Sequence, residues 1–138
     1  MIGTEIGSAA GIKALRHILI KGQMALLIEA SVAARRYGLE AELFKSVAEW
    51  YDSSSFMANA DRVLRTVTVH AKRRAEEADM AKALLTDLGI ESIMTAATSV
   101  LLHRIGDLGL RVSLGAVPPA SAKEAIDLMQ AYATKSQY

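Results

Sequence analysis

The chain has 138 residues, a length that fits one domain and is too short for two ordinary ones. It contains no cysteine, which excludes a disulfide framework and a thiolate metal site. Its 16 basic and 15 acidic residues nearly balance, so no overall attraction to nucleic acid is expected. Hydrophobic residues make up 51% of the chain but aromatic residues only 5%, a composition that favours helices over a β-sandwich or barrel.

The first predicted element is one very long helix. Residues 1–7 are punctuated by glycine and read as the remnant of a linker or strand, and Ser8 stands where an N-cap belongs. Residues 9–37 contain no proline, and Gly38 is typical of a helix end. The interior Gly22 costs about 1 kcal/mol against alanine, which indicates a close approach of another helix at this point.

Further helical patterns follow along the rest of the chain. They cover residues 39–51, a stretch from Ser55 or Asn59 through His70, residues 76–88, residues 91–108 and residues 122–134. Residues 109–119 read as a loop, and no run alternates with the period of two that a strand requires. We therefore predict an all-α fold of about six helices around one long N-terminal helix, forming a single domain over residues 8–138.

Neither of the two most apolar windows is long enough to cross a membrane. These windows cover residues 24–34 and 93–105, and about 20 apolar residues are needed for a span. Residues 1–7 have neither the basic region nor the apolar region of a signal peptide. The sequence thus predicts a cytoplasmic protein without a membrane partner.

A basic stripe on the long helix is the most informative polar pattern. Lys13, His17 and Lys21 are spaced four residues apart and so share one helical face. Like charges at this spacing repel, so helix stability does not explain them. Beside the small residues Gly7 and Ser8, the stripe is suited to an anionic substrate group, and a partly desolvated lysine among cations can act as a base. A solvated basic face is the alternative, and spacing alone favours it.

The remaining basic and histidine residues suggest structural roles. His70 and His103 have no metal-ligand partners at useful spacing, so no metal site is predicted. The cluster at residues 72–74 lacks interleaved aromatic residues and is followed by acidic ones, which favours a solvated helix face over a nucleic-acid contact. We therefore expect no nucleic-acid partner.

The start of the chain resembles the helical C-terminal domain of the 6-phosphogluconate and 3-hydroxyisobutyrate dehydrogenase superfamily, the β-hydroxyacid dehydrogenases. That family carries Gly-x-Gly-x-x-x-Lys-x-x-x-Asn where its long helix begins. Here Gly7 matches the first glycine and Lys13 the lysine, whereas Ala9 replaces the second glycine and His17 the asparagine.

Other motifs point to one subfamily of prokaryotic oxidoreductases, in which a helical domain of unknown function follows an NAD-binding domain. They are Lys21-Gly22, the run Ala25-Leu26-Leu27-Ile28-Glu29-Ala30, and Arg73-Arg74-Ala75-Glu76-Glu77.

The resemblance implies a role for each residue of the stripe. Lys13 would be catalytic, exchanging the proton of a substrate hydroxyl, and Gly7, Ser8, His17 and Lys21 would bind a small anionic substrate. From the residues alone, His17 either hydrogen-bonds the substrate or Lys13, or is an ordinary helix histidine. The resemblance also implies a homodimer that forms through the long helix.

Two departures limit what the resemblance implies. A second acid of 6-phosphogluconate dehydrogenase, seven residues after the lysine, is replaced by Ile20, which does not support a decarboxylation. A lysine of the wider family is also missing from the segment before Gly89, so Arg73 and Arg74 are the candidates for a cofactor contact.

Cofactor binding is not expected of this chain alone. It has no Gly-x-Gly-x-x-Gly turn and no strand–helix alternation, so the N-terminal Rossmann domain that holds NAD or NADP is absent. The first hypothesis is therefore the C-terminal substrate-binding and dimerisation domain of an NAD(P)-dependent hydroxyacid oxidoreductase, inactive without its cofactor domain. The alternative is a stand-alone helical dimerisation or scaffold module without catalysis.

Overall fold

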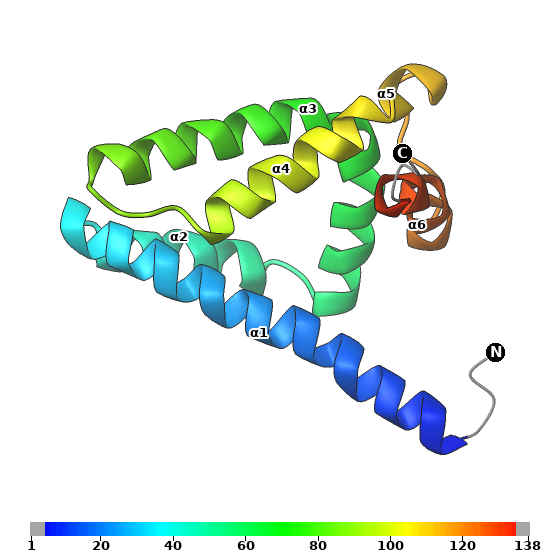
Figure 1. The fold of residues 1–138 in the computed structure, drawn as a ribbon, viewed down its shortest axis with the longest axis horizontal. Helices are drawn as coiled ribbons and strands as arrows, with labels where there is room; N and C mark the ends of the chain where they lie inside the picture. The colour runs from blue at the N-terminus through cyan, green and yellow to red at the C-terminus, as the bar shows by residue number, and fades with distance from the viewer. Residues whose placement is uncertain (1–4, 135–138) are drawn as a thin grey trace.

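A computed structural model describes residues 5–134 and confirms the all-α prediction, since no strand occurs within this range (Figure 1). The elements are α1 (Glu5–Tyr37), α2 (Glu40–Asp52), α3 (Phe56–Asp87), α4 (Met94–Asp107), α5 (Leu110–Ser113), α6 (Ala122–Met129) and a final 3₁₀ turn, η1 (Gln130–Ala133).

The start of α1 differs from the prediction. The described part of α1 begins at Glu5, so residues 5–7, predicted as linker, are helical, and Ser8 lies inside the helix instead of capping it. No proline interrupts this stretch, and adding a residue to an existing helix costs far less than starting one, so the helix continues through its glycines. The prediction for residues 1–4 falls outside the described residues.

Two of the predicted helices form one continuous helix in the structure. A short helix that was not predicted brings the number of α-helices within residues 5–134 back to six. The stretches before and after the basic cluster merge into α3, which is 32 residues long. Neither glycine nor proline separates them, and an Arg73–Glu77 ion pair of 2.7 Å joins successive turns. The segment predicted as a loop contains α5. Three other helix ends agree with local signals: α3 begins after Ser55, one of its two predicted starts, Ser121 caps α6, and Gly38 after α1 has a φ of 78°.

Helix α3 bends part-way along its length (Figure 1). Two threonine hydroxyls in its first half donate to backbone carbonyls of the preceding turn, Thr66 to Arg62 at 2.8 Å and Thr68 to Arg65 at 2.6 Å. Such bonds compete with the helical ladder and commonly bend helices. The bend gives α3 two directions, so that it contacts α4 along one part and α6 along another.

The hydrophobic core lies among α3, α4, α5 and α6. Its buried members are Ala71, Ile105, Leu110, Ala125 and Met129. Helix α4 approaches α3 closely at Gly106, where a Cβ atom would lie only 2.9 Å from Cγ of Lys72. The small side chains Ala71 and Gly106 therefore permit the tight α3–α4 contact on which the core is built.

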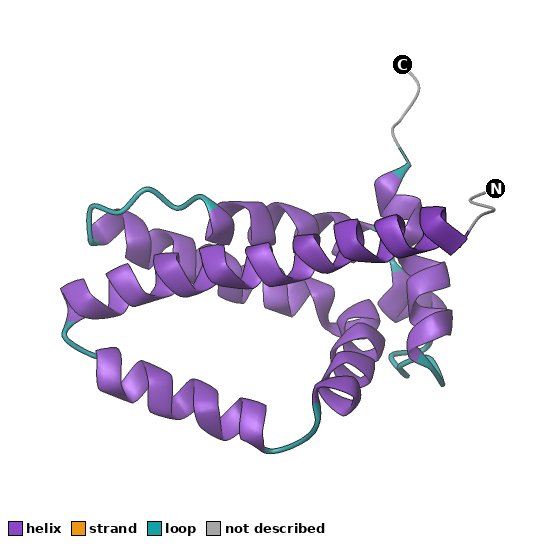
Figure 2. Ribbon diagram, turned by 90° about the horizontal axis from the view of Figure 1, so that it is seen from below, coloured by secondary structure: helices purple, strands orange, loops and turns teal. Residues whose placement is uncertain are grey.

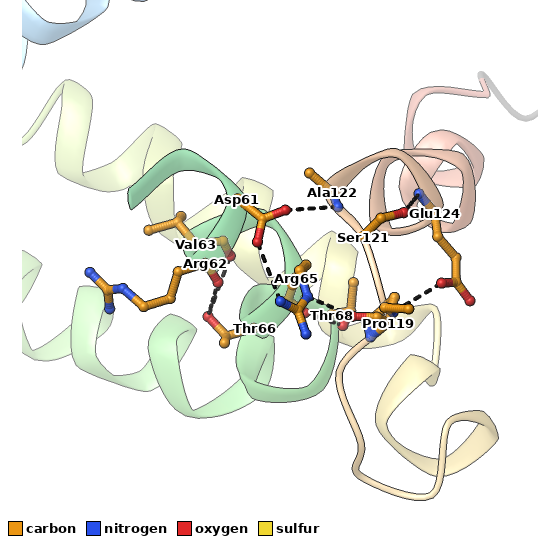
Figure 3. A network of polar contacts seen from close by, with 11 residues as sticks. Asp61, Arg62, Val63, Arg65, Thr66, Thr68, Pro119, Ser121, Ala122 and Glu124 are labelled. Atoms are coloured by element: carbon orange, nitrogen blue, oxygen red, sulfur yellow. Dashed lines mark hydrogen bonds and ion pairs between the residues drawn. The ribbon is translucent and has the colours of Figure 1, made fainter. Parts of the chain in front are cut away.

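A polar network fastens α6 to the first half of α3 (Figure 3). Arg65 donates from Nε to the carbonyl of Pro119 at 2.6 Å, and Asp61 accepts from the backbone N–H of Ala122 at 3.2 Å. At the start of α6, Ser121 accepts from the N–H of Glu124 at 3.2 Å, and the Glu124 carboxylate accepts from the N–H of Ala120 at 3.0 Å. This reciprocal arrangement resembles a capping box.

Two charged side chains attach the C-terminal half of α1 to the α3–α4 turn. The Glu29 carboxylate accepts hydrogen bonds of 2.8–2.9 Å from three successive backbone N–H groups at the start of α4, and one of 2.5 Å from the Thr95 hydroxyl. Arg36 donates from Nη1 to the carbonyls of Leu88 and Gly89 at 2.8 and 2.9 Å, at the end of α3. Each charge meets the helix terminus of opposite partial charge, which stabilises this arrangement.

Among the described residues, no charged side chain of the N-terminal half of α1 bonds to another helix, and this half runs on past the end of α2 (Figures 1 and 2). Its large apolar side chains are exposed: Ile12 by 66%, Leu15 by 62% and Ile18 by 72%. Helix α2 likewise contains no buried residue. By length and hydropathy alone, the segment from Gly7 to Tyr37 is also long and apolar enough to cross a membrane, which the sequence windows above did not indicate.

Candidate functional site

The predicted basic stripe forms a shallow depression on the projecting half of α1. Lys13, His17 and Lys21 line it together with Arg16 and Ile20. All five side chains are exposed, and within residues 5–134 no carboxylate lies at ion-pair distance from the three basic side chains of the stripe. The Lys21 ammonium lies 3.9 Å from Sδ of Met24 on the next turn. The depression is therefore cationic with one apolar side chain in its floor, and it can receive an anion.

The two small residues assigned to the same site lie elsewhere on the helix. Ser8 precedes Lys13 by five residues, which places the two about 140° apart around a helix of about 3.6 residues per turn. Neither Gly7 nor Ser8 lines the depression. The structure thus brings Lys13, His17 and Lys21 together. The other two predicted residues, Gly7 and Ser8, lie elsewhere on α1.

Two interior glycines of α1, Gly11 and Gly22, have no close neighbour among the described residues. A Cβ atom added at Gly11 or Gly22 would meet no atom within 4 Å. The close helix approach predicted at Gly22 is therefore not made by any described residue.

Arg73 and Arg74, the candidates for a cofactor contact, lie on α3 and not in the depression of α1. Arg73 pairs with Glu77 at 2.7 Å, and Arg74 donates from Nη2 to the Thr66 hydroxyl at 2.7 Å. Burial lowers the pKa of Arg74, and the neighbouring positive charge of Arg73 lowers it further. The structure does not bring these arginines to Lys13.

A cluster of Asp79, Ser99 and His103 joins α3 to α4, and sequence reasoning did not find it. Oγ of the buried Ser99 donates to Oδ1 of Asp79 at 2.5 Å, and Nε2 of His103 lies 2.8 Å from Oδ2. The hydrogen bonds from Ser99 and His103 lower the pKa of Asp79. The four-residue spacing of Ser99 and His103 was the available signal, but their partner Asp79 is 20 residues from Ser99 and 24 from His103.

This cluster is not arranged for nucleophilic catalysis. A serine nucleophile requires a base hydrogen-bonded to its hydroxyl, with a third group behind that base. Here the carboxylate stands between the serine and the histidine. The cluster acts as a polar connection between two helices, which agrees with the structural role predicted for His103. Across residues 5–134, no three His, Asp or Glu side chains gather as a metal site requires.

An apolar groove of about 630 Å³ separates α1, α2 and the end of α3. Its walls include Leu26, Ala30, Leu43, Leu84 and Leu85. The face of α1 that lines the groove continues toward the N-terminus through Leu19, Leu15 and Ile12, at helical spacing. The apolar side of α1 therefore extends well beyond the part that this chain covers.

Comparison with known proteins assigns the chain to a family. The family described as a domain of unknown function, DUF1932, matches residues 34–105, just over half of the chain. The chain belongs to this family. The matched region of DUF1932 runs from the end of α1 through α2 and α3 into α4, and so includes the α3–α4 contact on which the core is built. No curated protein and no solved structure matches the chain.

Proposed function

We propose that this DUF1932 chain is the C-terminal substrate-binding and dimerisation domain of an NAD(P)-dependent hydroxyacid oxidoreductase, similar to the 6-phosphogluconate and 3-hydroxyisobutyrate dehydrogenases. The observation that carries the proposal is the cationic depression of Lys13, His17 and Lys21 on the projecting half of α1, whose large apolar side chains are exposed. Membership of DUF1932 agrees with the resemblance to oxidoreductases in which a domain of unknown function follows an NAD-binding domain.

The chemistry proposed for Lys13 is proton exchange. Nicotinamide supplies or accepts the hydride in such a reaction. Oxidation of an alcohol also requires a base within hydrogen-bond reach of the hydroxyl, and the reverse reaction requires an acid there. The Lys13 amine takes the hydroxyl proton, and its ammonium stabilises charge that develops on the oxygen. His17 and Lys21, one and two turns further on, hold the anionic group of the substrate.

The residues of this chain do not fit a dinucleotide site. The sequence has no glycine-rich phosphate turn, and residues 5–134 contain no strand from which such a turn arises. We therefore assign NAD or NADP to a separate domain and expect none to bind to this chain alone.

The proposed homodimer covers the apolar side of α1. Monomeric proteins seldom expose contiguous apolar patches of this kind, and the groove between α1 and α2 extends the patch across both helices. A second copy brings the same surface, so one self-complementary contact covers both chains. Gly11 and Gly22 leave room for a second helix to approach α1 closely, which supports this arrangement.

A protein partner accounts for the apolar surface of α1 better than a membrane does. Lys13, Arg16 and Lys21 interrupt its exposed half, and charged side chains are costly within a bilayer. In the other half, Glu29 and Arg36 bond to the backbone of α3 and α4. We therefore propose a cytoplasmic location with neither a membrane nor a nucleic-acid partner.

The test is activity of the assembled enzyme. When a cofactor domain of this subfamily is joined to the chain, we expect hydroxyacid oxidation. Lys13→Ala should lower kcat by about 100-fold or more, the usual contribution of general acid–base catalysis. Lys45→Ala, at an exposed lysine of α2, is the matched control and should retain activity. Full turnover by the Lys13→Ala enzyme would refute the catalytic assignment and favour the non-catalytic scaffold.

A further inference from the structure

Two arginines and a histidine lie close together on α3 and α5, on a surface that the proposed function does not use. His70 lies on α3 one turn after Thr66 and one turn before Arg74. Arg74 reaches back over this turn to donate to the Thr66 hydroxyl at 2.7 Å, so its side chain extends along the face that carries His70. From α5, Arg111 donates to the carbonyl of Val69 at 3.0 Å, beside His70.

Among the described residues, no carboxylate forms an ion pair with any of these three groups, although the charge of Glu77 acts on Arg74 from a distance. Within residues 5–134, the only acidic side chain paired in this region is Glu77, and it pairs with Arg73. Arg74 and Arg111 each bond to a neutral oxygen instead, the Thr66 hydroxyl and the Val69 carbonyl. A guanidinium has five N–H donors, so both arginines keep donors for a ligand.

The electrostatic surroundings of His70 agree with this geometry. Burial lowers the pKa of His70, and the positive charges of Arg73, Arg74 and Arg111 lower it further. Burial also lowers the pKa of Arg74, and the positive charge of Arg73 lowers it further. The same positive potential that disfavours protonation of His70 attracts an anion.

We propose that His70, Arg74 and Arg111 bind a phosphate group of a small phosphorylated molecule. The guanidinium fork matches phosphate oxygens, and His70 adds a further donor between the two arginines. Both His70 and Arg74 are half-buried, so solvent screens their charges less than those of exposed lysines. His70 and Arg74 lie one turn apart on α3, roughly 6 Å along the helix, a spacing that suits one or two phosphates but not the extended track of a nucleic acid.

The experiment is a calorimetric titration of the full chain with inorganic pyrophosphate at low ionic strength. We expect one site tighter than any binding at the depression of α1, with Arg74→Gln and Arg111→Gln each weakening binding at this tighter site at least tenfold. Arg104→Gln removes the same charge from an exposed position on α4 and should change the affinity less than twofold. Lys13→Ala should also leave it unchanged, which separates this site from the basic stripe of α1. Absence of binding, or equal losses in Arg104→Gln or Lys13→Ala, would overturn the proposal.

A second measurement needs no variant and so does not depend on how variants fold. In the wild-type chain, pyrophosphate should raise the pH at which the His70 imidazole titrates by NMR, because a bound anion favours the charged ring. The His103 signal is the internal control and should move less. An unchanged His70 titration at saturating pyrophosphate contradicts the proposal, as does tighter binding of a duplex oligonucleotide than of pyrophosphate.

Discussion

At the scale of single residues, Glu29 has the largest structural role of any charged side chain in α1. Burial raises the pKa of its carboxyl group, but hydrogen bonds from the Thr95 side chain and from three backbone N–H groups outweigh burial and lower the pKa from 4.5 to about 2. These donors are the first N–H groups of α4, which have no partner within their own helix. Glu29 therefore caps a helix that begins 65 residues later in the chain.

The capping role predicts a loss of stability in acid. Because the folded-state pKa of Glu29 is depressed, its contribution is complete above pH 4.5 and is lost as the pH falls toward about 2. Glu29→Gln should lower the stability at neutral pH by about 1–3 kcal/mol and flatten its decline over this window. Thermal unfolding followed between pH 2 and about 7 measures both effects. Glu91→Gln, at an exposed acid near the same turn, is the control, and equal behaviour of the two variants would contradict the capping role.

The contrast between caps shows what could be predicted from the sequence. Ser55 and Ser121 cap the helices that immediately follow them, so a local pattern was sufficient. The caps supplied by Glu29 and Arg36 come from a different helix, and a pattern of neighbouring residues contains no sign of them. The same holds for the distant partner of Ser99, whereas the basic stripe was predictable because its members follow one helical face.

At the scale of elements, the fold depends on how closely α3 and α4 approach. The predicted break within α3, between residues 70 and 76, was wrong. The change from basic to acidic residues in this segment places the Arg73–Glu77 ion pair between successive turns and does not end the helix. The bend of α3 arises from hydroxyl groups bonding to its own backbone, which helical periodicity does not reveal. Gly106 then matters for its size, since α4 approaches α3 at that point.

Substitution at Gly106 tests this contact. In Gly106→Ala the new methyl group would lie 2.9 Å from Cγ of Lys72 and 3.5 Å from its backbone nitrogen, so either the Lys72 side chain changes its rotamer or the two helices separate. We expect a loss of about 1–3 kcal/mol in the free energy of unfolding, the usual cost of overpacking, measured by denaturant titration. Val100→Ala changes a half-exposed position of the same helix and should cost less than about 0.5 kcal/mol. A Gly106→Ala chain as stable as the wild type would show that the contact is loose.

At the scale of the whole molecule, the helices bury their apolar side chains to very different extents. The core lies among α3 to α6, whereas α2 buries no residue and the N-terminal half of α1 projects from the rest. Such a surplus of exposed apolar surface is expected, because a long helix that is apolar on several sides cannot be covered by one small domain. Which surface remains uncovered depends on the tertiary contacts of Glu29 and Arg36, and these fasten only one half of the helix.

The uncovered half of α1 predicts self-association, which light scattering of the full chain will measure. We expect a dimer, and Leu15→Lys, which places a charge on the exposed apolar side of α1, should shift it to monomer at the same concentration. Val112→Lys introduces the same charge on α5, at a side chain that is 87% exposed, and should leave the dimer intact. A wild-type chain that stays monomeric at high concentration would exclude the dimer, and equal dissociation of the two variants would exclude α1 as its interface. Because Leu15 lies between Lys13 and His17 in sequence but around the helix from them, the monomeric variant also separates dimerisation from the chemistry of the basic stripe.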